Sequence, residues 1–175
     1  KVLRMVTRLN NEGMRVIAIA QKNNIADENN FSVEDESNMV LMGYVGFLDP
    51  PKDSAKDAIE ALNENGVAVK ILTGDNDAVT LKICKEVGLK ITNVLLGNEV
   101  EKMNDEELTE IVENTNVFAK LSPLQKSRII KILQNKGHTV GFMGDGINDA
   151  AALRQADVGI SVDTAVDIAK ESADI

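Results

Sequence analysis

The hydrophobic positions of this chain fall into short apolar runs that alternate with stretches of helical spacing. Continuous apolar strands alternating with helices are typical of a parallel sheet that helices cover on both faces. The pattern therefore predicts an α/β fold. The predicted strands lie near Val67, Val117, Val140 and Val158, and the predicted helices begin near Asp53, Asp75, Asp105, Pro123 and Asn148.

Two helices have core faces that the spacing of their apolar residues predicts. The first, which Gly66 closes, should turn Ala55, Ala58, Ile59 and Leu62 inward. The second has Ser122 as its N-cap and Pro123 at its first position, and it ends at Gly137. Its expected core residues are Leu124, Ile129, Ile130, Ile132 and Leu133.

The first 48 residues do not follow the alternating pattern. Helical spacing of Val2, Met5, Val6 and Leu9 predicts a helix that Gly13 ends, and a strand is expected from Val16 to Ala20. The polar, acidic stretch 23–38 reads as a surface connection, and Met39 to Leu48 as a strand entering the main domain.

Composition narrows the classes of function. The chain has 175 residues, of which 43% are hydrophobic and 27% charged, so it can bury one core and a small appendage. Its net charge of −9 argues against nucleic-acid binding, because such binding requires a basic face. No apolar run approaches the roughly 20 residues of a membrane-spanning helix. The lone cysteine, Cys84, reads as a core thiol.

A glycine-opened turn with two carboxylates follows the predicted strand Val140 to Met143. Its sequence is Gly144-Asp145-Gly146-Ile147-Asn148-Asp149, and a helical pattern begins directly after it. Asp145 and Asp149 supply the hard oxygen ligands that Mg²⁺ prefers, at the end of a parallel strand where α/β proteins bind ligands. The alternative is that Asp145 and Asn148 serve only as turn and capping residues.

Two further features of the sequence would suit the binding of an anion. Thr73-Gly74-Asp75-Asn76 ends the apolar run that starts at Val67, and its hydroxyl and backbone N–H groups lie at a helix start. Alternatively, this turn is an ordinary capped helix. Lys126 falls near the start of the helix from Pro123, where the helix dipole disfavours a cation, so a neighbouring anion is expected.

Together, in this order, the Thr-Gly turn, the helix-start lysine and the Gly-Asp-Gly-X-Asn-Asp loop resemble the later motifs of the haloacid dehalogenase-like superfamily. Asp49-Pro50-Pro51 with Thr73-Gly74-Asp75-Asn76 narrows the resemblance to P-type ATPases, and the sequence is most similar to bacterial magnesium-transporting ones. The resemblance implies a Rossmann-like parallel sheet with helices on both faces. It also implies Mg²⁺ and ATP as cofactors.

Residue roles follow from the same resemblance. It implies that Thr73, Gly74 and Lys126 hold phosphoryl oxygens, that Asn148 bonds the phosphorylated group, and that Asp145 and Asp149 bind Mg²⁺. Asp75 would meet the nucleotide or brace its loop, and Arg15 would reach a nucleotide phosphate.

The family's phosphorylated aspartate lies in an Asp-Lys-Thr-Gly-Thr motif, which these 175 residues lack. We therefore interpret residues 1–45 as the end of a nucleotide-binding domain and residues 46–175 as a phosphorylation domain without that motif. Such a piece should be inactive alone. Its partners would be ATP and the missing nucleotide-binding, actuator and transmembrane domains. The parent would transport a cation, Mg²⁺ by resemblance, with this part at the cytoplasmic face of the cell membrane.

Two other interpretations stay open from the sequence. A stand-alone phosphatase of the superfamily would use Asp49 as its nucleophile, although Pro50 and Pro51 remove the N–H groups that should cradle phosphate. A catalytically dead interaction module would keep Mg²⁺ binding only as a structural feature.

Overall fold

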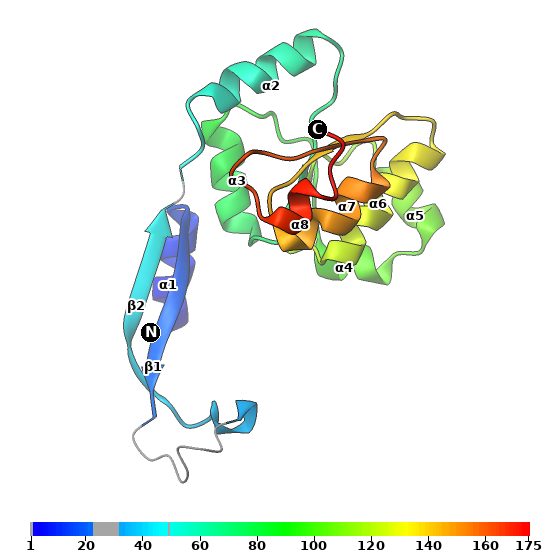
Figure 1. Ribbon diagram of the computed structural model, residues 1–175. Helices are drawn as coiled ribbons and strands as arrows, with labels where there is room; N and C mark the ends of the chain where they lie inside the picture. The colour runs from blue at the N-terminus through cyan, green and yellow to red at the C-terminus, as the bar shows by residue number, and fades with distance from the viewer. Residues whose placement is uncertain (1, 23–31, 49) are drawn as a thin grey trace.

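The computed structural model describes residues 2–22, 32–48 and 50–175. A hairpin unit near the N-terminus projects from a larger α/β body formed by residues 50–175 (Figure 1). Within the described ranges, no helix combines the length and the apolar character needed to cross a membrane.

The hairpin unit consists of one helix and two antiparallel strands. They are α1 (Val2–Asn11), β1 (Met14–Gln21) and β2 (Val40–Leu48), with a short 3₁₀ helix η1 (Val33–Asp35) before β2. Gly13, with φ of +85°, makes the turn between α1 and β1 that favours glycine. The predicted helix and first strand are confirmed.

The strand predicted from Met39 to Leu48 is confirmed as β2, which lies outside the parallel ladders. It pairs with β1 along its whole length, from Met14 opposite Leu48 to Gln21 opposite Val40. The apolar run identified the strand without identifying its partner. The boundary proposed after residue 45 falls inside β2, and residues 23–31 of the expected surface connection lie outside the described residues.

The α/β body contains short parallel strands and seven helices within residues 50–175. The strands are β3 (Ile71–Leu72), β4 (Val94–Leu96), β5 (Val117–Ala119), β6 (Gly141–Met143) and β7 (Val158–Ile160). The helices are α2 (Ser54–Glu64), α3 (Asp77–Glu86), α4 (Gly97–Lys102), α5 (Asp105–Ile111), α6 (Pro123–Asn135), α7 (Ala150–Gln155) and α8 (Asp167–Lys170). A 3₁₀ turn, η2 (Ile147–Asp149), precedes α7.

All strand pairs in the body are parallel, which confirms the predicted fold class. Hydrogen bonds join β3, β5 and β4 in that order, and they join β6 to β7 as a second ladder. Among the described residues, no ladder links β6 to β3. The expected single sheet is therefore divided at this point.

Helices cover both faces of the three-stranded ladder. Successive strand residues point to opposite faces, and β5 shows the result, since Phe118 and Val117 are both fully buried but belong to different core clusters. Phe118 packs with residues of α4, α5 and α6, whereas Val117 packs with Cys84 of α3 and with Ile59 of α2. The predicted core thiol is confirmed.

Several residues expected in the core are exposed. Leu124 is 79% exposed, and Ala58 and Leu62 on α2 are exposed as well. Leu124 lies in the first turn of α6, and α2 packs against the core through Ala55 and Ile59. Met143 is also exposed, so β6 is not the buried strand that its apolar sequence predicted.

The start of β3 is anchored by a half-buried amine. The ammonium group of Lys70 donates hydrogen bonds of 2.7 to 2.9 Å to the carbonyls of Val112, Glu113 and Thr115, just after α5. These acceptors satisfy all three of its N–H donors. Burial lowers the pKa of Lys70 below its ordinary value. The contact fixes β3 directly before the turn at Thr73.

Candidate active site

The turn after β3 is closed by its own hydroxyl. The backbone N–H of Asp75 donates to Thr73 Oγ1 at 3.1 Å. Asn76 then caps α3, because its side-chain oxygen accepts a hydrogen bond from Val79 N at 3.0 Å. The capped-helix interpretation is therefore correct for Asn76. Thr73 and Gly74 lie between the end of β3 and this cap.

Hydrogen bonds join this turn to the loop that begins α6. Thr73 N donates to Phe118 O at 2.9 Å, and Leu121 N donates to Thr73 O at 2.9 Å. Lys120, in the left-handed region with φ of +55°, donates from its N–H to Asp75 O at 2.8 Å. These bonds bring the Thr73 turn beside the first turn of α6.

Lys126 lies in that first turn and is buried, with 8% of its surface exposed. The helix begins as predicted, with Ser122 as N-cap and Pro123 at the first position. The ammonium group donates to Asp149 Oδ1 at 2.7 Å, and both side chains are nearly withdrawn from solvent. The carboxylate of Asp149 is therefore the anion that this lysine was expected to have nearby.

The loop after β6 holds its two carboxylates differently. Asp149 Oδ2 accepts from Gly146 N at 3.2 Å, and Asp149 N donates to Gly146 O at 3.0 Å. A Cβ atom on Gly144 would lie 2.6 Å from Asp149 Cβ, so only glycine permits this approach. Asp145 and Asn148 are exposed. The loop thus presents one fixed carboxylate and one that faces solvent.

The donor set of this loop fits Mg²⁺. Within the described ranges, no group of three or more His, Cys, Asp or Glu side chains gathers closely enough to hold a metal alone. Mg²⁺ does not need such a cage, since proteins usually bind it through one or two carboxylates and leave its other positions to water and phosphate. Asp145 and Asp149 can supply those carboxylates.

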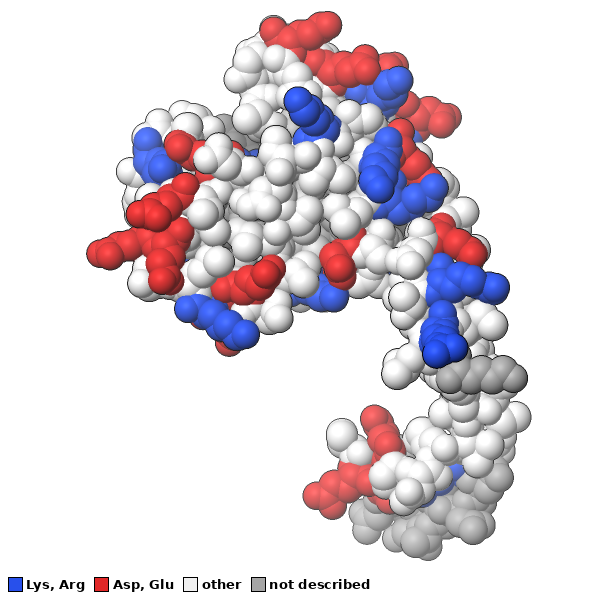
Figure 2. Space-filling model, turned by 180° about the vertical axis from the view of Figure 1, so that it is seen from behind, with Lys and Arg blue, Asp and Glu red and all other residues white. Residues whose placement is uncertain are grey.

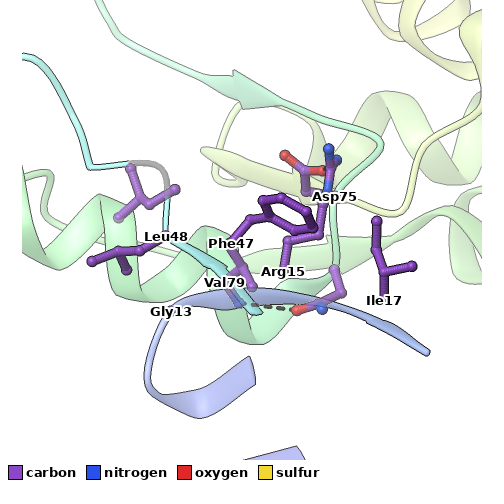
Figure 3. Close-up of a pocket in the computed structure, with 9 residues that line it drawn as sticks. Gly13, Arg15, Ile17, Phe47, Leu48, Asp75 and Val79 are labelled. Carbon is purple, nitrogen blue, oxygen red and sulfur yellow. Dashed lines mark hydrogen bonds and ion pairs between the residues drawn. The ribbon is translucent and has the colours of Figure 1, made fainter. Parts of the chain in front are cut away.

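A cavity of about 510 Å³ lies between the hairpin unit and the body. Arg15 on β1 points across it and pairs with Asp75, sixty residues later in the chain (Figure 3). Ile17 and Phe47 line its hairpin side, and Val79 lines the side of α3. The structure therefore brings together the two residues expected to meet the nucleotide.

Sequence reasoning missed the apolar lining of this cavity. Ile17 follows Arg15 by two positions, and Phe47 is the cross-strand partner of Arg15. The period of two in a strand would have placed Ile17 on the face of Arg15. The pairing of β1 with β2, which identifies Phe47, has no signal in the sequence.

A second ion pair lies near the same turn. Lys120 Nζ is 2.7 Å from Asp77 Oδ1 in the first turn of α3. The hydrogen bond from Lys120 lowers the pKa of Asp77 below its ordinary value of 3.8. Charges of both signs also lie beside each other on the molecular face in Figure 2, where no continuous basic surface is visible.

Asp49, the nucleophile of the alternative phosphatase interpretation, lies outside the described residues.

Comparison with known proteins defines the family. A model of haloacid dehalogenase-like hydrolases matches residues 4–157. The chain belongs to this family. The match covers both the hairpin unit and the loop that carries Asp145 and Asp149, in agreement with the parallel α/β body.

Curated relatives confirm the resemblance to P-type ATPases. The chain is 51% identical over all of its 175 residues to "Magnesium-transporting ATPase, P-type 1" of Escherichia coli (strain K12). It is 59% identical over 168 residues, 95% of its length, to the protein of that name in Salmonella typhimurium. A calcium-transporting ATPase of Listeria monocytogenes is 37% identical over 93% of the chain. The chain spans only about a fifth of the length of each relative, 18–20%.

Proposed function

We propose that this chain is the phosphate- and magnesium-handling part of a P-type cation-transporting ATPase. The parent would couple ATP hydrolysis, through a phosphorylated aspartate, to ion transport. The observation that carries the proposal is the buried contact of Lys126 with Asp149, next to the Thr73 turn. That arrangement provides phosphate donors and carboxylate metal ligands at one edge of the parallel strands.

The side chains can share the work of holding a phosphoryl group. An ammonium group has three N–H donors, so Lys126 keeps two for phosphoryl oxygens after its bond to Asp149. The Thr73 hydroxyl and the Gly74 amide would add further donors, and Asn148 would bond the phosphorylated group from the loop. Fixed donors of this kind stabilise the charge that builds up during phosphoryl transfer.

Asp145 and Asp149 would hold Mg²⁺. When bound, the ion would neutralise negative charge on the phosphoryl oxygens. Asp149 would be kept in place by Lys126 and by the Gly146 amide, while the exposed Asp145 would supply a ligand from the solvent side.

The nucleophile would come from another part of the parent polypeptide, because the Asp-Lys-Thr-Gly-Thr motif does not occur in this chain. The division of the strands into two ladders supports this. β3 and β6 are both edge strands, and they lead into the Thr73 turn and the Asp145 loop respectively. A parallel strand paired with either edge would end beside these residues. Without it, the isolated chain should neither hydrolyse ATP nor become phosphorylated.

ATP would bind where the hairpin unit faces the body. The nucleotide-binding domain, assigned to residues 1–45, would include α1, β1 and most of β2, and the phosphorylation domain, assigned to residues 46–175, would include the end of β2 and the whole body. Arg15 would reach a phosphate and Asp75 would meet the nucleotide, within a cavity whose walls include Ile17 and Phe47. One cationic group among apolar walls suits a ligand with a flat base and a charged tail.

We further propose Mg²⁺ as the transported cation, with the parent in the cell membrane and this part on its cytoplasmic face. The support is the identity of 51–59% to relatives named for magnesium, against 37% to the Listeria relative named for calcium. The other partners would be the actuator, nucleotide-binding and transmembrane domains of the same polypeptide.

Thermal melting of the chain with and without Mg²⁺ tests the metal site. At a concentration tenfold above its Kd, a ligand of the folded state adds about 1.4 kcal/mol of stability, which raises Tm by roughly 3–5 °C in a chain of this size. Asp145→Asn should remove most of this shift. Asp57→Asn, on the exposed first turn of α2, is the matched control and should keep it. Equal Tm values for the unmutated chain in both conditions would contradict the site.

A further inference from the structure

The segment after β7 makes two hydrogen bonds to the loop that carries Asp145. Ser161 Oγ donates to the carbonyl of Gly144 at 3.0 Å. The backbone N–H of Val166 donates to the carbonyl of Asp145 at 3.1 Å. Two consecutive carbonyls of the loop are therefore held from the same segment.

These two bonds act on the two peptide planes that flank the Cα atom of Asp145. The Gly144 carbonyl lies in the plane before that atom, and the Asp145 carbonyl lies in the plane after it. Each peptide unit is planar and rigid, so fixing both planes fixes the direction in which the Asp145 side chain leaves the backbone. Asp145 itself is exposed, so its direction depends on how the backbone is held.

Ser161 is well anchored for such a task. It directly follows β7, whose pairing with β6 continues through a bond of 3.1 Å from Gly144 N to Ile160 O. Its own N–H donates to Ile175 O at 2.8 Å. The hydroxyl therefore extends from the end of a paired strand to a loop on the neighbouring strand.

We propose that Ser161 is a positioning residue for the magnesium site. Its hydroxyl holds the Gly144–Asp145 peptide so that the Asp145 carboxylate is already directed at the ion before the ion arrives. A ligand held in place in advance loses less conformational entropy on binding, which strengthens the affinity. The inference rests on the proposed function, because it requires that Asp145 bind Mg²⁺.

Titration of the chain with Mg²⁺, followed by the NMR shifts of the Gly146 and Asp149 amides, tests this role. Ser161→Ala removes one hydrogen bond and should weaken Mg²⁺ binding by about threefold to tenfold. Ser161→Thr keeps the hydroxyl and suits a residue at a strand end, so its affinity should stay within about twofold of the unmutated chain. Amide hydrogen exchange of Gly146, measured without the metal, should be faster in Ser161→Ala alone.

Ser172→Ala is the matched control. The Ser172 hydroxyl donates to Ile168 O at 2.7 Å and accepts from Arg154, so the variant also loses local hydrogen bonds in the C-terminal segment. These bonds do not involve the loop of residues 144–149. Stability should fall, whereas the Mg²⁺ affinity should not change.

The outcomes separate the two proposals. If the unmutated chain binds Mg²⁺ at the loop and Ser161→Ala binds it equally well, the positioning role is wrong and the metal site stands. If Ser172→Ala weakens binding as much as Ser161→Ala does, the effect is general destabilisation and the role is again wrong. If Mg²⁺ shifts no loop amide of the unmutated chain, the magnesium site itself fails.

Discussion

Lys126 occupies a position that costs free energy in two ways. It is buried, and it lies in the first turn of α6, where the helix dipole disfavours a positive charge. The carboxylate of Asp149 offsets both costs through a contact of 2.7 Å. A buried ion pair of this kind adds little stability over an apolar pair, so its presence here is better explained by the phosphate chemistry that it would serve.

Lys126→Ala should therefore be strongly destabilising. The substitution leaves the Asp149 carboxylate nearly buried without its cation, which typically costs about 3 kcal/mol or more. Lys131→Ala, on the exposed side of the same helix, should change stability by no more than about 0.5 kcal/mol. Urea unfolding of both variants measures the difference in stability, and equal unfolding midpoints would contradict the role given to the Lys126–Asp149 ion pair.

Asp77 gives the stability a dependence on pH. Its pKa is lowered in the folded state by the hydrogen bond from Lys120, so its stabilising contribution is present above about pH 3.8 and is lost as pH falls through the folded-state pKa. The stability gap between the unmutated chain and Asp77→Asn should therefore close below pH 3.8. Urea unfolding of both proteins at a series of pH values from about 2.5 to about 6 measures this difference in stability.

Lys120→Met provides the control for this prediction, because it removes the partner and keeps the carboxylate. It should lose the same pH-dependent component as Asp77→Asn. A gap that stays constant down to the lowest pH would show that the ion pair does not stabilise the fold.

How far single residues could be predicted depends on the distance along the chain to their partners. Residues of one turn or loop, such as Thr73 or Asp145, are recognisable because the whole local pattern lies in consecutive positions. The pairing of Arg15 with Asp75 spans sixty residues, and the contact of Ser161 with Gly144 joins the ends of two neighbouring strands. Such contacts depend on tertiary structure, which no local pattern contains.

At the scale of secondary structure, the strands β3, β5, β6 and β7 and the helix α7 were predicted although each of them is short. The helix α6 begins and ends where its cap, proline and glycine indicated. β4, of three residues, and α4, of six, follow each other directly and were not predicted as separate elements. Val67 and Met143 are apolar, yet both are exposed in the described part of the chain.

Gly97, the first residue of α4, tests how closely α4 packs against the loop before α6. A Cβ atom there would lie 2.2 Å from the carbonyl oxygen of Lys120, a backbone atom that cannot rotate away. Gly97→Ala should destabilise the fold by about 1–3 kcal/mol. Gly43→Ala on β2 is the matched control, because no atom lies within 4 Å of its added Cβ. Equal unfolding midpoints for the two variants would show that the approach of α4 to Lys120 is not close.

At the scale of the whole molecule, the sequence predicted the class of fold but not the pairing of its strands. Alternating apolar runs and helices indicated parallel strands with helices on both faces, which the body confirms. The antiparallel pairing of β1 with β2 and the division between β3 and β6 had no such signal. Both depend on which strand edges pair, and apolar runs do not indicate the pairing.

The central claim is that this chain is the phosphate- and magnesium-handling part of a P-type ATPase. Cells that make the protein can be fractionated, their membranes incubated briefly with γ-³²P-labelled ATP and Mg²⁺, and the parent collected with an antibody against this chain. We expect an acid-stable, hydroxylamine-labile phosphoprotein. Since the chain covers 20% of the Escherichia coli relative, the phosphoprotein should be about five times longer than the chain.

The purified chain, treated in the same way, should remain unlabelled because it lacks the Asp-Lys-Thr-Gly-Thr motif. A parent that the antibody collects from membranes without any label, or a label on the purified chain itself, would contradict the claim.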